Sequence, residues 1–145
     1  MYNPNGYDAF PSLEMMDGLI DIYMPDLKYA ADALGQKYSD VPDYYTVAQA
    51  VLLEMYRQVG DPVIENGIMR KGVLIRHLMM PGLTEDSMRV LDWIKANLPA
   101  AVVNLMEQYR PTYRAKEYEE INRRPTSKEF MAVKAHFNNL DLHMC

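Results

Sequence analysis

The stretch "GVLIRHLMMPG", from Gly72 to Gly82, decides the fold class. Its residues are almost continuously apolar, whereas a strand with one face in water alternates between apolar and polar side chains. An unbroken apolar run of this length is typical of a strand that is covered on both faces, as in parallel α/β sheets. We therefore expect a buried strand over residues 72–82.

Two more apolar stretches, residues 20–25 and 100–107, predict neighbouring strands. Helices are expected around them, at 29–38, 43–60 and 84–97 and after residue 126, where Thr126 and Glu129 form a capping-box pattern. Residues 61–72 read as a loop with a short hairpin-like element, and 108–125 as a solvated excursion.

The alternation of strands and helices predicts an α/β fold with about three parallel βα units and right-handed crossovers. Three strands leave both edges of a parallel sheet unpaired unless other segments cover them. We therefore expect residues 1–145 to be one part of a larger unit. On its own the chain would then associate with itself or aggregate.

Composition excludes several classes of partner. The net charge of -5 and the pI of about 5.1 argue against binding to nucleic acid or an anionic membrane. No apolar stretch approaches the roughly 20 residues that span a bilayer. The first ten residues lack the basic and apolar regions of a signal peptide, and a lone cysteine, Cys145, fits a reducing compartment. We expect a cytoplasmic protein.

Charged side chains follow the first strand and interrupt the second. Asp26 and Lys28 share the parity of one strand face, and Arg76 shares a face with the apolar residues of its own strand. Ligands of parallel α/β folds gather at the carboxyl ends of the strands, so these three side chains are expected to converge there. Either they form an internal salt bridge that closes the sheet end, or they bind a polar ligand such as a carboxylate, a phosphate or a ribose.

The histidines give weaker evidence for a functional site. His77 has the opposite parity to Arg76 and is expected to be a hydrogen-bonded core residue. His143 and Cys145 lie at the end of the chain, and two ligands do not complete a metal site. We predict no metal site in this chain.

Four stretches in order resemble one family: "NPNGY" (3–7), "DIYMPDLKY" (21–29), "GVLIRHLMMPG" (72–82) and "VNLMEQYRP" (103–111). They are similar to radical S-adenosylmethionine (SAM) proteins related to pyruvate formate-lyase-activating enzyme, and the resemblance extends over residues 3–140. It implies a partial TIM-like barrel of six βα units, of which this chain is the C-terminal half. In that family a CxxxCxxC loop in the first half holds a [4Fe–4S] cluster. The cluster cleaves bound SAM to a radical that abstracts hydrogen from a glycine in a partner protein.

The resemblance also implies a set of site residues. Asp26 and Lys28 match the family's D-L-K motif and Arg76 matches the arginine of its "IR" strand, positions that line the SAM pocket. Gln108 and Tyr109 match more loosely, where the last strand meets the same pocket.

One cysteine cannot supply the thiolates that an iron–sulfur cluster needs, so we expect the chain alone to bind no cluster and to be inactive. It is then a truncated product, a mis-assigned start or an excised domain. Its partner would be the missing barrel half or a second copy, and its protein substrate a glycyl radical enzyme or another protein. Two alternatives remain: a non-catalytic half-barrel interaction module, and a plain α/β domain whose charges are structural.

Overall fold

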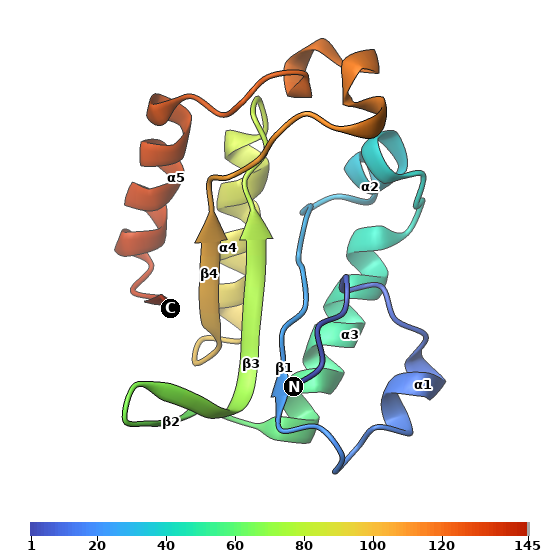
Figure 1. Cartoon of the computed structure of the whole chain (residues 1–145), viewed down its shortest axis with the longest axis vertical. Coiled ribbons are helices and arrows are strands. Elements are labelled where there is room, and N and C mark those ends of the chain that lie inside the picture. The colour runs from blue at the N-terminus through green and yellow to red at the C-terminus, as the bar shows by residue number, and fades with distance from the viewer. Residues whose placement is uncertain (145) are drawn as a thin grey trace.

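The computed structural model describes residues 1–144 as an α/β fold with a mostly parallel sheet (Figure 1). Four parallel strands follow in the order β1 (Ile22–Tyr23), β3 (Ile68–Leu78), β4 (Val102–Met106) and β5 (His143–Met144), and β2 (Val63–Glu65) pairs antiparallel with β3. The helices are α1 (Phe10–Glu14), α2 (Asp32–Ser39), α3 (Tyr44–Val59), α4 (Thr84–Asn97) and α5 (Ser127–Asn139). Two short 3-10 helices, η1 (Tyr113–Glu117) and η2 (Glu119–Ile121), lie in the excursion after β4.

The hydrophobic core lies on one face of this sheet. Val73, Ile75 and His77 of β3 and Val103 of β4 are fully buried there, against side chains of α3, α4 and α5. We call this the covered face. Figure 1 shows α4 behind β3 and β4, with the front of these strands free of helices.

The opposite face differs from the expectation that both faces would be covered. Its apolar side chains, such as Leu74 and Leu78 of β3 and Met106 of β4, are only half-buried. We call this the open face. The continuous hydrophobicity of the sequence predicted that other elements would cover both faces of the sheet, and within residues 1–144 helices cover one face.

The edges of the sheet are covered by segments that the sequence analysis did not assign. Residues 2–4 run parallel to β1, where the Tyr2 N–H donates to the Ile22 carbonyl at 2.8 Å and the Met24 N–H donates to the Tyr2 carbonyl at 2.8 Å. At the other edge, β5 pairs with β4. Short segments thus pair with part of each edge of the three expected strands, and β5 reaches only Val102 and Val103 of β4.

Several boundaries moved for identifiable reasons. β3 begins at Ile68, before the expected Gly72, because a hairpin turn at Asn66 and Gly67, both with positive φ, pairs it with β2. Helix α2 begins at Asp32 instead of residue 29, because the Ala30 N–H is bound by the Asp86 carboxylate in an extended segment. Within residues 1–144, no helix has the length and hydropathy needed to cross a bilayer.

Candidate functional site

Three polar side chains form a row across the open face. Parallel pairing sets Asp26 beside Arg76 and Arg76 beside Asn104, so one residue of each strand segment lies at the same level. We call these three residues the polar row. It lies near the carboxyl ends of the strands, which is where ligands collect in parallel α/β sheets.

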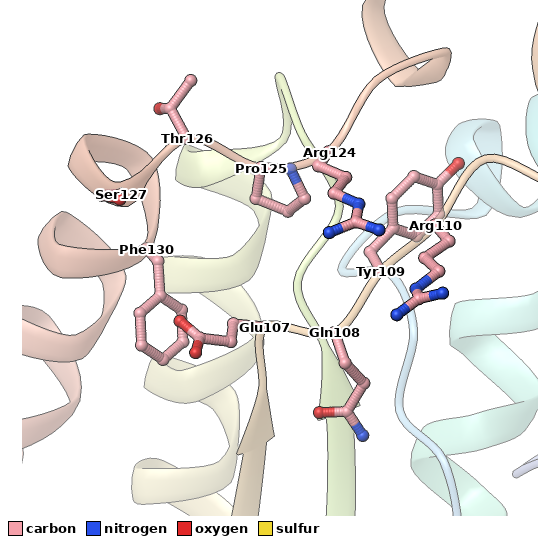
Figure 2. A pocket seen from close by; sticks show the side chains of 9 residues that line it. All are labelled: Glu107, Gln108, Tyr109, Arg110, Arg124, Pro125, Thr126, Ser127 and Phe130. Atoms are coloured by element: carbon pink, nitrogen blue, oxygen red, sulfur yellow. The ribbon is translucent and has the colours of Figure 1, made fainter.

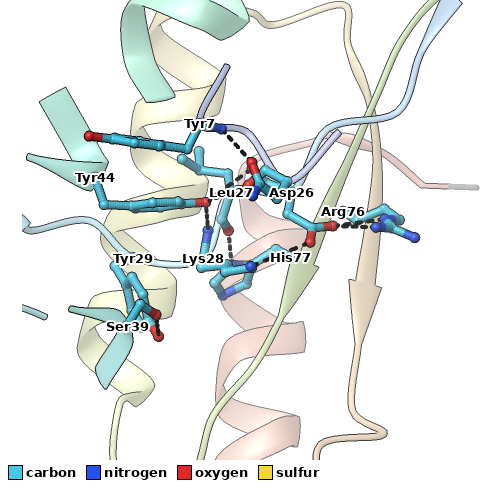
Figure 3. A network of polar contacts seen from close by, with 10 residues as sticks. Tyr7, Asp26, Leu27, Lys28, Tyr29, Ser39, Tyr44, Arg76 and His77 are labelled. Carbon is cyan, nitrogen blue, oxygen red and sulfur yellow. Dashed lines mark hydrogen bonds and ion pairs between the residues drawn. The ribbon is translucent and has the colours of Figure 1, made fainter. Parts of the chain in front are cut away.

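An ion pair joins the first two members of the row (Figure 3). Arg76 donates to Asp26 Oδ1 from Nε at 2.8 Å and from Nη2 at 2.6 Å. The side chains are 27% and 20% exposed, so the pair is partly shielded from water. Lys28 Nζ lies 3.8 Å from Asp26 Oδ2 and is 39% exposed. The three residues lie close together, as expected, and the ion pair joins Asp26 to Arg76.

The backbone explains why the charges share one face. Beyond Tyr23 the chain stays extended: the Arg76 N–H donates to the Pro25 carbonyl at 2.8 Å and the Leu27 N–H to the Arg76 carbonyl at 2.9 Å. Side chains therefore keep alternating through Lys28. Leu27 is buried in the core, while its two charged neighbours face the open side.

Tyr44 of α3 connects this extended segment to the N-terminal loop. Its hydroxyl accepts the Lys28 N–H at 3.1 Å and lies 3.2 Å from the Asp26 carbonyl and 3.3 Å from the Asn5 carbonyl, to which it can donate. Burial raises the pKa of Tyr44 far above its usual range, so the hydroxyl keeps its proton at neutral pH. Tyr7 stacks on the Tyr44 ring, with 6.2 Å between the centroids.

Gly6 makes the closest approach to this segment. It adopts a φ of +80°, and a Cβ placed on it would lie 2.0 Å from the Asp26 carbonyl oxygen. The positive φ fits the turn expected for the "NPNGY" stretch. The loop can therefore reach the Asp26 backbone because this residue has no side chain.

On the covered face, His77 is a hydrogen-bonded core residue, as predicted. Its Nδ1 lies 2.7 Å from the Leu27 carbonyl oxygen and its Nε2 lies 2.9 Å from Ser87 Oγ. Because a carbonyl only accepts, Nδ1 carries the proton and Nε2 accepts from the Ser87 hydroxyl. Burial lowers the pKa of His77, which keeps the ring neutral.

Asp86, in the first turn of α4, was not recognised from the sequence. Its carboxylate oxygens accept the Ala30 N–H at 3.1 and 3.2 Å, and the residue is 3% exposed. Burial raises the pKa of Asp86, and the hydrogen bond from Ala30 opposes that shift. An acidic residue in a first helical turn is common, so the sequence offered no signal for this long-range contact.

Gln108 and Tyr109 lie apart from the ion pair, beside a hollow of about 310 Å³ at the end of β4 (Figure 2). Tyr109 donates its hydroxyl hydrogen to the Ile121 carbonyl at 3.0 Å, while Gln108 is exposed. Asp26, Lys28 and Arg76 do not line this hollow. The five predicted site residues therefore form two groups.

The described part of the chain contains no group of three or more His, Cys, Asp or Glu side chains arranged to hold a metal ion. His143 is exposed in β5, and Cys145 lies outside the described residues.

Comparison with known proteins gives a relative without a stated function. The chain is 35% identical over 147 residues to the uncharacterized protein MJ0674 of Methanocaldococcus jannaschii. The alignment covers 98% of this chain and 39% of that protein, so the chain spans about two fifths of the relative's length. No family model matches the chain. Neither comparison names a radical SAM protein, and the resemblance therefore rests on the four sequence stretches.

Proposed function

We propose that the chain is the C-terminal half of a radical SAM barrel and that Asp26, Lys28 and Arg76 form part of its SAM pocket. One observation carries the proposal: an ion pair with an adjacent lysine lies on the open face of a parallel sheet, near the strand ends. The helices cover the opposite face of the sheet, so the open face is the one from which a ligand could reach these charges.

The chemistry of these side chains fits the polar parts of SAM. Asp26 Oδ2 lies 3.8 Å from Lys28 Nζ, beyond hydrogen-bonding distance, so it retains capacity to accept from a ribose hydroxyl or an ammonium group. The Lys28 ammonium suits the carboxylate of the methionine moiety. The bond to Asp26 fixes the orientation of the Arg76 guanidinium, which retains further N–H donors.

The iron–sulfur cluster of the family does not fit this chain alone, because its 145 residues include one cysteine. In the proposed assembly, the other half of the barrel supplies the cluster ligands and covers the open face. SAM bound to such a cluster supplies radical hydrogen abstraction. The substrate would be a glycine of a partner protein, as the family resemblance implies.

A second candidate function is a non-catalytic interaction module. The half-buried apolar side chains of the open face favour it, because such a surface suits a second copy or another chain. This candidate requires no ligand at the polar row.

Titration of the isotopically labelled chain with SAM, followed by NMR, tests the first candidate. We expect saturable shifts at Asp26, Lys28 and Arg76 that are lost in Asp26→Asn. They should be retained in Glu14→Gln, which changes an exposed carboxylate in α1. If the resonances of these three residues do not shift even at high SAM concentration, a SAM pocket here is refuted.

A second experiment tests the family. The Methanocaldococcus jannaschii relative, expressed without oxygen and reconstituted with iron and sulfide, should develop the electron paramagnetic resonance signal of a reduced [4Fe–4S] cluster and cleave SAM. A reconstituted protein without iron and without cleavage would exclude the family assignment, whatever the isolated chain binds.

A further inference from the structure

A second group of charges lies at the hollow beside β4. Its wall consists of the segment that leaves the strand and the segment that enters α5, including Arg110 from the first and Arg124 from the second. Figure 2 shows both guanidinium groups on the same side of the hollow, while Glu107 points the other way, toward Phe130. We call this the arginine hollow.

The two arginines differ from others in the same excursion. Arg114 pairs with Asp40 at 2.9 Å, and Arg123 pairs with Glu129 at 2.8 Å. Within residues 1–144, neither Arg110 nor Arg124 has a carboxylate within 4.0 Å. Two like charges lining one hollow repel each other unless an anion lies between them.

The surrounding charge has the same sign. The excursion, residues 108–125, carries five of the 15 lysines and arginines of the chain and three of its 20 acidic residues, while Glu107 also lines the hollow. The excursion itself is therefore basic in a protein whose net charge is -5. Such a local field attracts anions to this end of the molecule.

We infer that Arg110 and Arg124 form a binding site for the phosphoryl group of a small ligand. A phosphoryl group carries roughly two negative charges near neutral pH, which matches two guanidinium groups, and its oxygens suit their forked donors. The hollow, at about 310 Å³, admits such a group with a small attached moiety. Ser127 at its rim belongs to the first turn of α5, where the helix dipole adds partial positive charge.

This site stands apart from the proposed SAM pocket. Phosphate binding requires none of Asp26, Lys28 or Arg76, because these residues do not line the arginine hollow. The variant Asp26→Asn should therefore leave phosphate affinity unchanged, and the two proposals fail separately.

Calorimetric titration of the full chain with inorganic phosphate at pH 8 and low ionic strength tests the inference. We expect saturable binding that weakens roughly tenfold in R110Q and in R124Q and is lost in the double variant. R70Q is the matched control, because Arg70 is also exposed and lies in the hairpin at the other end of β3. It should change the affinity less than twofold.

Two results would overturn the inference. Equal loss of affinity in R70Q and R110Q would mean that phosphate senses only the general charge. Acetate binding as tightly as phosphate would assign the hollow to carboxylates. The three arginines are all exposed, so unaltered thermal melting is expected and makes the affinities comparable.

Discussion

Both faces of the sheet carry aliphatic side chains, but the surroundings of these side chains differ. On the covered face, Tyr23, Ile75 and Val103 have no accessible surface. On the open face, Ile22 and Leu74 come from the same two strands and are only half-buried. The difference teaches that hydrophobicity along a strand reports what a face is suited to contact. Which contacts are made depends on the elements that pack against it.

The comparison is tested most strongly by removing one aliphatic side chain from each face of β3. Ile75→Ala should lower the free energy of unfolding by about 2–5 kcal/mol, because it opens a cavity in the core. Leu74→Ala should cost about 1 kcal/mol, since its side chain is already in partial contact with water. Urea unfolding measures both. Equal costs would show that the open face is covered in solution, as self-association would do.

Tyr44 and Tyr7 provide a polar version of the same comparison. Tyr44→Phe removes the acceptor of the partly buried Lys28 N–H and should cost about 1–3 kcal/mol. Tyr7→Phe removes an exposed bond to Asp43 and should change stability by less than about 0.5 kcal/mol. Chemical denaturation of the two variants gives the difference directly. If the Tyr44→Phe protein is as stable as the Tyr7→Phe protein, the Tyr44 hydroxyl does not hold the Asp26–Lys28 segment in place.

The covered face should also respond to pH through His77. Its pKa in the folded chain is lowered from the ordinary value of 6.5, so below that pH the unfolded chain binds a proton that the folded chain does not. Stability should therefore fall as the pH drops below 6.5, by up to about 1.4 kcal/mol per pH unit, until the folded pKa is reached. The midpoint of urea unfolding between pH 7.5 and pH 5 measures it. His77→Gln should flatten the dependence, and an unchanged slope would assign it to other groups.

A smaller effect than in the core is expected at the polar row. Asp26→Asn and Arg76→Gln each break one partly exposed ion pair, so each should cost about 1 kcal/mol. The double variant should cost little more than either single change, because both remove the same interaction. A double-mutant cycle by urea unfolding measures the coupling. A loss of 3 kcal/mol or more from one change would mean that the pair is deeply buried.

The order of strands and helices was accessible from sequence because long periodic segments carry a strong signal. Helix α3 and helix α4 lie where their apolar spacing placed them, and the capping box of Thr126 and Glu129 is formed in both directions. The meeting of Asp26 and Arg76 also followed, because parity and parallel pairing together fix the face and the level of each side chain.

Other features had no local signal. The edge segment at residues 2–4 and strand β5 are too short to show a period of two, and their pairing depends on a neighbour far along the chain. Tyr44 reads as one more apolar position of a helix, although its hydroxyl is the link to Lys28. The arginine hollow brings together Arg110 and Arg124, which lie more than ten positions apart in the sequence. Their proximity depends on how the chain packs between β4 and α5, so no local sequence pattern predicts it.

The contact at Gly6 offers a way to disturb the geometry of the polar row without changing any of its charges. A methyl group added there would clash with the Asp26 carbonyl oxygen, which lies 2.0 Å from the position of such a Cβ. The strain would displace the backbone that Tyr44 holds in place. A neutral residue outside the polar row therefore sets where the Asp26 carboxylate lies, and the geometry of the ion pair depends on the absence of a side chain at position 6.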